Sequence, residues 1–579
     1  MTARRYAALV ATLTAAVLGL AACTSIPSSG PVNEGDGVVS SSDPVVPIAE
    51  GPRKDDTPSG IVNGFVIASS AGFDSDFTVA REYLTSEAAA TWDPTANVTV
   101  FDSGAVETNF DVDTNTMTYD VPVLATLDDS GRLTEAADGT RETLTFTLAQ
   151  DSNDQWRIAE LADGAILAKP NFERLFTPVS LIFASVDETT QVPELRWLPE
   201  KKAATLAARE LVEGPSEALA PAVHTGFPAA SALEVDSVIV TDGVAAVQLT
   251  AGSAGDAAQR SLAEQQMTLT LASIPGVRTV TVTVGGVALG GDNSADLAPA
   301  PLPGPDAAAF VNDRLGLWDG EDVWQATGDA GGLPPNSRGL AQSFDTSQAA
   351  WVVDDSRLVA SSLLEDRVGS LEPYDEEAAA PTSQMETDSL YQGTNLVAPS
   401  ADRHGWFWTT EVSDATELVA VTRKGEVTKL PVDWLRGTSV QGLSVSRDGA
   451  RIVVLSQSGG KQLLEIASVV RGEDGTPLSV GDPVAIGADL GPAIDVTWVD
   501  DLTVAVLGAG GNEVPSELWF VEVGGLTTAM KSVTDAVDIT AREQERSLVV
   551  VDTEHEAFTR SGAVWSKVAT GPSELAYSG

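Results

Sequence analysis

The feature that most constrains the fold is a strand–turn–strand unit that recurs through the second half of the chain. Its clearest copy is residues 442–456, where two apolar strands flank the turn residues Asp448-Gly449. Further copies with the same order stand at 339–353, 396–410, 494–507 and 536–551. A spacing of roughly 45–55 residues, with about four strands in each unit, is typical of a β-propeller. We therefore predict that residues 306–579 form an all-β propeller, with strands at 310–318 and 562–568 closing the ring.

A proline-rich linker over 292–305 precedes these repeats and separates them from an α+β unit over 176–291. Thr241-Asp242-Gly243 predicts a hairpin turn inside this unit. Strands are expected at 181–185, 194–199, 233–240, 244–250 and 277–284.

Two helices are expected in the same unit. The first covers 201–212 and ends at Gly214-Pro215, and the second begins after the capping residue Asp256. The second helix is expected to bury one stripe, formed by Ala258, Leu262, Gln265, Leu269 and Ala272.

Residues 58–168 are predicted to form another α+β domain. Thr57-Pro58 is a typical start for a helix that buries Ile61, Phe65 and Ala68. A second helix is expected after Asp74 or Asp76, with an apolar stripe of Phe77, Ala80, Leu84 and Ala88, ending at Asp93-Pro94. Strands are expected at 97–101, 117–127, 142–150 and 155–161. Two helices followed by a curved antiparallel sheet are similar to the nuclear-transport-factor (NTF2-like) fold.

The start of the chain has the parts of a secretory signal over residues 1–22: two arginines, an apolar run and small residues. Leu20-Ala21-Ala22-Cys23 resembles the lipobox of bacterial lipoproteins. The resemblance implies that the sulfur of Cys23 receives a diacylglycerol, typically with palmitate, and that cleavage makes Cys23 the N-terminus. The alternatives are an ordinary secreted protein or an uncleaved anchor helix. Residues 23–57 are rich in Ser, Pro and Gly and are predicted to be a flexible tether.

Composition excludes several functional classes. The formal charge is −49, which argues against binding of nucleic acid. Cys23 is the one cysteine, so disulfides, thiol catalysis and cysteine-ligated metals are not expected. The three histidines, His224, His404 and His555, are far apart in the sequence, so we expect no metal site and no cofactor.

Four short motifs are candidates for binding sites. Residues 404–408, His-Gly-Trp-Phe-Trp, could stack on a sugar, but packing between propeller blades is the favoured interpretation. Asp111 to Asn115 fails the calcium-loop pattern and predicts a hairpin turn. Gly508 to Gly511 leads into a strand rather than a helix, so it is expected to be an inter-strand loop rather than a phosphate site. His555 is expected in an exposed turn. We predict no catalytic residue.

Two resemblances extend this interpretation. Residues 210–215, the Asp242-Gly243 hairpin and residues 268–277 resemble the GerMN domain of spore-germination proteins. The order of lipobox, tether, α+β domain, GerMN-like domain and propeller, with the segment Cys23 to Pro31, resembles the LpqB family of actinobacterial lipoproteins. The GerMN family has no established catalytic residues, so this resemblance implies none here.

The family resemblance implies a function and a partner. LpqB proteins are regarded as accessories of the MtrAB two-component system that contact the extracytoplasmic part of the sensor kinase MtrB. We therefore expect a non-enzymatic binding protein, lipid-anchored on the outer side of the cell membrane, that acts in envelope homeostasis and division. The alternatives are an envelope enzyme that acts on glycan or peptide with carboxylates in the propeller channel, and a purely structural spacer.

Overall fold

The structure is a computed structural model that describes residues 49–73, 75–289, 296–326, 331–363, 371–413, 415–511, 514–562 and 564–578. The predicted signal peptide, Cys23, most of the tether and residues 292–295 of the predicted linker lie outside the described residues. Among the described residues, no helix is long and apolar enough to cross a membrane.

The first helix of the N-terminal domain forms where its capping signal predicts. Helix α2 covers Pro58–Gly72, with Pro58 in the first turn. The Thr57 hydroxyl accepts a hydrogen bond from the Gly60 amide at 3.1 Å, which satisfies one of the amides left free at a helix start. Ile61, Phe65 and Ala68 are buried, so the predicted apolar face is confirmed.

The prediction of one continuous second helix is wrong. Residues 78–91 form two short helices, α3 Thr78–Arg81 and α4 Ser86–Thr91. Between them the chain is extended at Leu84, which forms a bridge to Ile158, and Thr85 then caps α4. The stripe of Phe77, Ala80, Leu84 and Ala88 is nevertheless buried, because both short helices turn their apolar side toward the same core.

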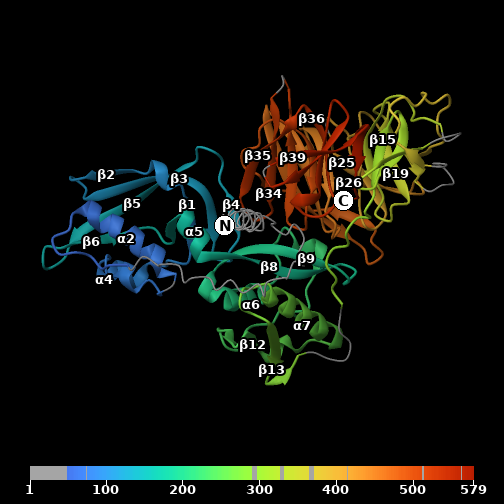
Figure 1. Cartoon of the computed structure of the whole chain (residues 1–579). Helices are drawn as coiled ribbons and strands as arrows, with labels where there is room; N and C mark the ends of the chain where they lie inside the picture. Colours follow the sequence, from blue (N-terminus) through green and yellow to red (C-terminus); the bar gives the residue numbers. More distant parts are fainter. Residues whose placement is uncertain are drawn as a thin grey trace, which may run out of the picture. The chain divides into compact units, whose positions relative to one another are not determined.

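A mixed sheet completes this domain, and α2 and α4 lie along it (Figure 1). Its strand order is β6-β5-β3-β1-β7, with β2 and β4 also paired to β3. Strands β1 and β7 are parallel, so the expectation of a purely antiparallel sheet is wrong. The similarity to the nuclear-transport-factor fold stays a prediction. The elements are β1 Asn97–Phe101, β2 Glu107–Asp111, β3 Thr116–Asp128, β4 Leu133–Glu135, β5 Arg141–Gln150, β6 Trp156–Glu160, β7 Ala165–Ala168 and helix α5 Lys169–Leu175.

The second α+β domain has two small sheets and two helices. The first sheet has the order β10-β8-β9 and the second the order β11-β12-β13-β14. Asp242 and Gly243 both have positive φ, 49° and 77°, as the predicted tight hairpin between β11 and β12 requires. The elements are β8 Phe176–Ser185, β9 Gln191–Pro199, α6 Ala203–Glu213, β10 Val223–His224, β11 Ile239–Thr241, β12 Val244–Leu249, α7 Ala257–Ala272, β13 Thr279–Val284 and β14 Val287–Ala288.

Helix α7 buries a different face from the one predicted. Of the five residues expected inward, Leu262 is fully buried, whereas Ala258 and Ala272 are exposed. The buried face carries Leu262, Ala263, Met267 and Leu271 together with three polar residues, Ser261, Gln266 and Thr270. The Thr270 hydroxyl accepts from the Ile182 amide at 2.9 Å, and the Gln266 carbonyl accepts from the Gly226 amide at 2.8 Å. Gln266 and Thr270 are buried because they pair with buried backbone amides.

The described residues from Ala307 onward form six antiparallel sheets of four or five strands. The first sheet contains β15 Ala307–Val311, β16 Arg314–Trp318, β17 Val323–Ala326, β21 Leu371–Pro373 and β40 Pro572–Ala576. The second contains β18 Ser337–Gln342, β19 Gln348–Val353, β20 Arg357–Ser362 and β22 Asp388–Gln392. The third contains β23 Ser400–Ala401, β24 Trp406–Thr409, β25 Glu417–Thr422 and β26 Val427–Pro431.

The other three sheets repeat this order. The fourth contains β27 Ser439–Val445, β28 Arg451–Ser458, β29 Lys461–Arg471, β30 Pro477–Val480 and β31 Val484–Ile486. The fifth contains β32 Ala493–Trp498, β33 Thr503–Gly508, β34 Pro515–Glu522 and β35 Thr527–Thr534. The sixth contains β36 Ala536–Ala541, β37 Leu548–Asp552, β38 Glu556–Ser561 and β39 Val564–Thr570.

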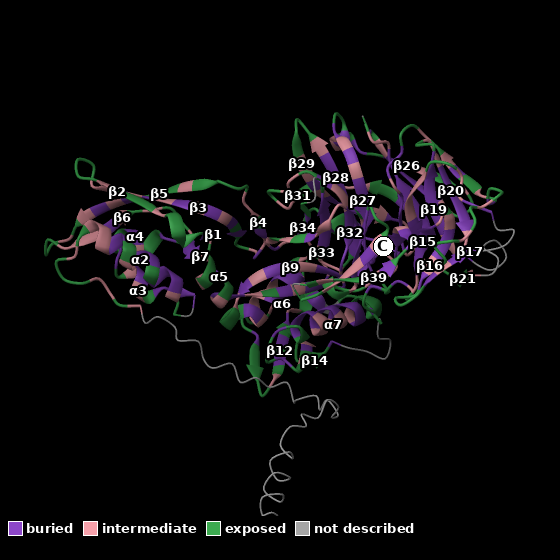
Figure 2. Cartoon of the chain, turned by 45° about the horizontal axis from the view of Figure 1, so that its top comes forward, coloured by how far each residue is buried: buried purple, intermediate pink, exposed green. Residues whose placement is uncertain are grey.

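These sheets are the blades of a β-propeller. The inner strands β18, β23, β27, β32, β36 and β40 contact one another in turn around a ring. The five repeats found in the sequence coincide with the first two strands of the second to sixth blades. Buried residues fill the interior between blades (Figure 2). Trp498, for example, is fully buried and donates from its indole nitrogen to the Ser444 carbonyl of the preceding blade at 3.1 Å.

The ring closes with a strand other than the one predicted. Residues 562–568 were expected to close it, but they belong mostly to β39, the outer strand of the sixth blade. The chain then turns at Gly571, whose φ is 114°, and enters β40. Strand β40 pairs with β15 of the first blade, Leu575 opposite Ala309. The expected early segment 310–318 covers the end of β15, a turn and all of β16, and the strand that pairs with β15 lies closer to the C-terminus than expected.

Candidate functional site

Several segments of the propeller contact the second α+β domain, among them strand β29, the loop at Gly524 and one turn of the third blade. This turn covers Asp402 to Gly405, between β23 and β24, and Gly405 has a φ of 84°. The Asp402 carboxylate accepts from the amides of His404 and Trp406 at 2.9 and 3.0 Å. These local bonds fix the turn and present Arg403 and His404 outward from the blade.

Two buried side chains also donate hydrogen bonds to the carboxylate of Asp402. Its second oxygen accepts from the Trp408 indole at 2.8 Å and from the Arg471 guanidinium at 2.6 Å. Arg471 also stacks over the Trp408 ring. Because Asp402 and Arg471 are almost fully buried, removing one of them leaves an unpaired buried charge, which is strongly destabilising.

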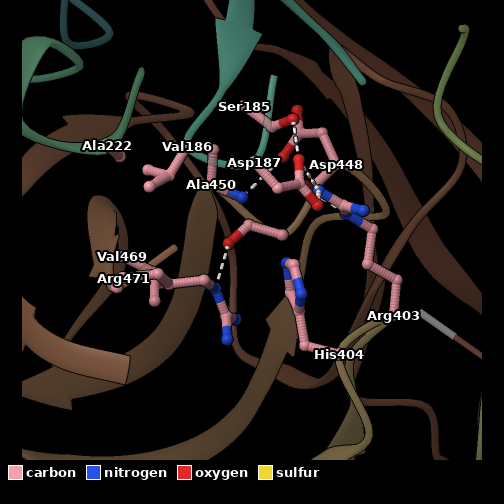
Figure 3. Close-up of a pocket in the computed structure, with 12 residues that line it drawn as sticks. Ser185, Val186, Asp187, Ala222, Arg403, His404, Asp448, Ala450, Val469 and Arg471 are labelled. Carbon is pink, nitrogen blue, oxygen red and sulfur yellow. Dashed lines mark hydrogen bonds and ion pairs between the residues drawn. The ribbon is translucent and has the colours of Figure 1, made fainter. Parts of the chain in front are cut away.

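Arg403 joins two blades to the neighbouring domain. Its Nε donates to the Asp448 carbonyl in the fourth blade at 2.9 Å. Its terminal nitrogen donates to both carboxylate oxygens of Asp187 at 3.0 Å. Asp187 lies in the turn between β8 and β9, and Figure 3 shows its carboxylate directed at Arg403. We call Asp187, Arg403, His404 and Arg471 the interdomain clamp.

The surroundings of Asp187 and His404 in the clamp shift the pKa values of both side chains. Burial acts to raise the pKa of Asp187, but hydrogen bonds from Arg403 and Ser185 outweigh it and hold that pKa well below its ordinary value. Burial lowers the pKa of His404 to about 4, and the charges of Arg471 and Arg403 act in the same direction. Asp187 is therefore charged and His404 neutral at pH 7.

The space beside the clamp is too small for a substrate. The pocket lined by Asp187, His404, Asp448 and Arg471 has about 10 Å³ of free volume, room for a single water molecule. The described residues contain no group of three or more histidines, cysteines or carboxylates that could hold a metal ion. The clamp therefore serves as a structural contact rather than a binding pocket.

The aromatic motif beside the clamp packs between blades. Trp406, Phe407 and Trp408 are all buried. The two tryptophans belong to the core shared with the fourth blade, and Phe407 belongs to the core shared with the second. The favoured interpretation of residues 404–408 is confirmed, because no indole face is exposed for a sugar.

The remaining motifs also lie as expected. Asp111 to Asn115 forms the turn between β2 and β3, where the Asp111 carboxylate accepts from the Asp113 amide at 2.9 Å. Residues 508–511 lie between β33 and β34. His555 is exposed, with a φ of 60°, in the turn after β37. The prediction of lipid attachment at Cys23 stays a prediction.

Three carboxyls lie on inner strands of the propeller, which line its central channel. Asp495, Asp538 and Glu574 stand on β32, β36 and β40. Each accepts a hydrogen bond from the inner strand of the next blade: Asp495 from the Ile539 amide at 3.2 Å, Asp538 from the Leu575 amide at 2.9 Å, and Glu574 from the Leu340 amide at 2.8 Å.

The channel carboxyls have raised pKa values. Burial raises the pKa of Asp495 to about 7, although its backbone hydrogen bonds act to lower it. Burial, together with Asp495 and Glu574, raises the pKa of Asp538 well above its ordinary value. Burial also raises the pKa of Glu574. Nothing in the sequence distinguishes these three carboxyls from the other acids, because the chain has 83 acidic residues.

Three family models match consecutive parts of the chain. "Lipoprotein LpqB, N-terminal domain" matches residues 51–173, "Sporulation and spore germination" matches 180–290, and "Lipoprotein LpqB beta-propeller domain" matches 379–575. Seven strands of the ring, β15 to β21, lie before residue 379.

Relatives match over nearly the whole length. Lipoprotein LpqB of Thermobifida fusca is 28% identical, over 87% of this chain and 88% of the relative. Lipoprotein LpqB of Streptomyces coelicolor is 28% identical, over 98% and 97%. Among solved structures, the first GerMN domain of the sporulation protein GerM from Bacillus subtilis is 21% identical, over 21% of this chain and 97% of that one, with a TM-score of 0.17. A TM-score this low supports no conclusion.

Proposed function

Because the chain belongs to the LpqB family of actinobacterial lipoproteins, we propose that it is a lipid-anchored accessory protein on the extracytoplasmic face of the cell membrane. It binds the extracytoplasmic domain of an MtrB-like sensor kinase and modulates an MtrAB-like two-component system in envelope homeostasis and division. The observation that carries the proposal is the match to LpqB proteins over nearly the whole chain.

The proposed anchor is a lipid on Cys23. Two or more acyl chains on one residue give stable membrane attachment. Attachment confines the protein and the kinase near one surface and raises their effective concentration, so a modest affinity suffices. Cys23→Ser is expected to abolish incorporation of labelled fatty acid. Labelling that persists in this variant contradicts the proposal.

The binding role is tested by kinase output. Full-length protein and kinase are placed in the same vesicles, and autophosphorylation of the kinase is measured with no lipoprotein, with the natural protein and with Cys23→Ser. The proposal expects a change in autophosphorylation with the natural protein, and a smaller change with Cys23→Ser at equal concentration. No change with the natural protein, together with no co-purification of the kinase, contradicts it.

A second candidate function is an envelope enzyme that acts on glycan or peptide with the channel carboxyls. The raised pKa of Asp495 favours it, because acid–base catalysis near neutral pH needs such a group. Asp495→Asn separates the two candidates. A binding protein keeps its effect on the kinase in this variant, whereas an enzyme loses its activity while still binding the kinase.

A further inference from the structure

The outer sheet of the second α+β domain is covered by helices on one face only. Strands β11 to β14 form this sheet, and helices α6 and α7 lie between it and strand β8 (Figure 1). Ala245, Val247 and Val282 point toward the helices and are buried. The alternate residues of the same strands point to the opposite face, and most of them are exposed.

We call this second side of the sheet the open face. The strand register makes it one continuous surface, because Ala246 of β12 lies opposite both Ile239 of β11 and Thr281 of β13. Thr283 of β13 lies opposite Ala288 of β14 in the same way. The residues of the open face are Ile239, Thr241, Val244, Ala246, Gln248, Thr279, Thr281, Thr283 and Ala288.

The sheet carries no charge. None of the 17 residues in its four strands is Asp, Glu, Lys or Arg, although 20% of the whole chain is charged. Exposed aliphatic side chains also gather here. Of the 14 large hydrophobic side chains exposed among the described residues, five lie between Val235 and Val287, and Ile239 of the open face is 65% exposed. Exposed apolar side chains that gather in one place mark an interaction surface.

Charged residues stand at the two ends of this sheet. Asp242 and Arg278 are exposed at the end where the β11–β12 hairpin turns, and the Arg278 guanidinium donates to the Asp242 carbonyl at 2.8 Å. Glu234 is exposed at the other end, where its amide donates to the Gln248 carbonyl at 2.8 Å. An uncharged centre with a charged rim is the usual composition of a protein–protein interface.

The charge of the whole chain indicates which partner this face fits. At a formal charge of −49, two copies repel each other over most of their surfaces. A surface that binds its own copy across a two-fold axis meets the same residues, so a charged centre would oppose the contact and an uncharged one does not. A basic partner would instead be attracted to the acidic surfaces of the chain. The open face therefore fits a second copy of this chain.

The size of the face predicts a weak contact. Strands about 4.8 Å apart with a rise of about 3.3 Å per residue give this sheet an area of about 270 Å². A stable interface buries about 800 Å² on each partner. The contact is therefore expected to be weak between copies in solution and substantial between copies held on the same membrane.

We infer that the open face binds the open face of a second copy, so that the protein dimerises where it is concentrated on a membrane. The inference goes beyond the proposed function, since it concerns contact between two copies rather than contact with the kinase. It uses the proposed lipid anchor only as a means of concentrating the protein.

Crosslinking through a new cysteine tests the contact. Thr281→Cys places a thiol on the open face, and the matched control Thr145→Cys places one at an exposed threonine of β5, on a sheet face that also carries Asp120. Each full-length variant, and the natural protein as a control for Cys23, is placed in vesicles and treated with a bis-maleimide that spans about 10 Å, the spacing of packed sheets. Thr281→Cys is expected to give at least about tenfold more crosslinked dimer than Thr145→Cys. Equal yields overturn the inference.

A second variant tests whether the uncharged centre matters. Ala246→Glu, added to Thr281→Cys, brings like charges together across the contact and is expected to lower the yield of dimer at least tenfold. Ala246→Ser adds no charge and is expected to keep the yield. An unchanged yield in Ala246→Glu, at an unchanged melting temperature, overturns the inference.

Two further measurements separate this inference from the proposed function. Sedimentation of purified Cys23→Ser protein, up to about 0.5 mM, needs no anchor and is expected to show a dimer that increases with concentration and is lost with Ala246→Glu. A monomer at every concentration, together with equal crosslinking of the two cysteine variants, overturns the inference. A Thr281→Cys crosslink to the kinase in vesicles that contain it, with no dimer in vesicles that lack it, assigns the face to the kinase and also overturns the inference.

Discussion

At the residue scale, the propeller contains buried carboxyl groups that accept hydrogen bonds from backbone amides. Asp495 is the clearest case, because two amides donate to its carboxylate and its pKa is still raised to about 7. Desolvation of the charge therefore outweighs the hydrogen bonds at this position. The sequence shows that the chain is rich in acid, but it does not show which acids face the inner strands, because that depends on the register at each blade.

The raised pKa of Asp495 predicts a pH-dependent stability. A carboxyl with a folded pKa above its unfolded value contributes most below the unfolded pKa, and this contribution is lost as pH rises through about 7. Asp495→Asn removes the charge and keeps an oxygen for one of the two amides, since Val496 and Ile539 donate to different oxygens of the carboxylate. Its free energy of unfolding is expected to exceed that of the natural protein by about 1–3 kcal/mol at pH 8, with the difference shrinking toward pH 4.

Denaturant unfolding at pH 4, 6 and 8 measures this effect. Asp236→Asn, at an exposed position, is the control and is expected to change stability little at any of the three values. A stabilisation by Asp495→Asn that is the same at pH 4 and pH 8 contradicts the assignment of the effect to the charge of Asp495.

For Asp187, the dependence of stability on pH has the opposite sign. Its pKa is held below the ordinary value, so its contribution is present above pH 4 and is lost as pH falls below it. Asp187→Asn removes the ion pair with Arg403 and is expected to reduce stability by about 1–3 kcal/mol at pH 7. Hydrogen exchange of residues 186–190 should increase in this variant. Unchanged exchange would show that the clamp does not hold the β8–β9 turn.

At the element scale, local signals predict where elements begin and tertiary contacts decide how far they extend. Thr57 and Asp256 predict the starts of α2 and α7 correctly, because a cap acts within one turn of the chain. The face of α7 was predicted wrongly in part: Ala263, Met267 and Leu271 are buried in place of Ala258 and Ala272. Gln266 and Thr270 join this face through bonds to residues about 40 and 90 positions away. No pattern within the helix reports such bonds.

The capping box of α7 makes a prediction at this scale. The Asp256 carboxylate accepts from the Gln259 amide at 2.9 Å, and the Gln259 side chain accepts from the Asp256 amide at 3.0 Å. Asp256→Ala is expected to lower the free energy of unfolding by about 1 kcal/mol. Denaturant unfolding checks this value, with the exposed Ala258→Ser on the same helix as control. A cost no larger than that of the control would mean that the cap is redundant.

At the scale of the whole molecule, the repeated units can be predicted from the sequence, whereas pairs between distant residues cannot. Five of the blades can be predicted from the sequence, because apolar strands and turn residues alternate in each of them. The clamp between Asp187 and Arg403, and the pairing of Ala309 with Leu575, join residues more than 200 positions apart. Such pairs leave no local pattern, so the closing strand was assigned to the wrong segment and the clamp was not foreseen.

Closure by β40 makes the last prediction. Removal of residues 572–579 deletes the inner strand of the first blade and exposes the edge of β15, so the propeller is expected to lose cooperative melting and to aggregate. Scanning calorimetry and gel filtration measure both effects. A synthetic peptide of residues 571–579, added in excess, is expected to restore part of the transition. A truncated protein that melts like the full chain contradicts the role of β40.

The position of β40 at the end of the chain also determines the order in which the domains can fold. The ring cannot be completed until residue 576 is available to pair with residue 308, whereas the pairs within β1 to β7 involve residues close to one another in the chain. During synthesis, the N-terminal domain can therefore acquire its structure while the propeller is still an open row of sheets. Because contacts between distant residues form slowly, we expect closure of the ring to be the last step in folding of the propeller, after the strands of the other five blades have paired.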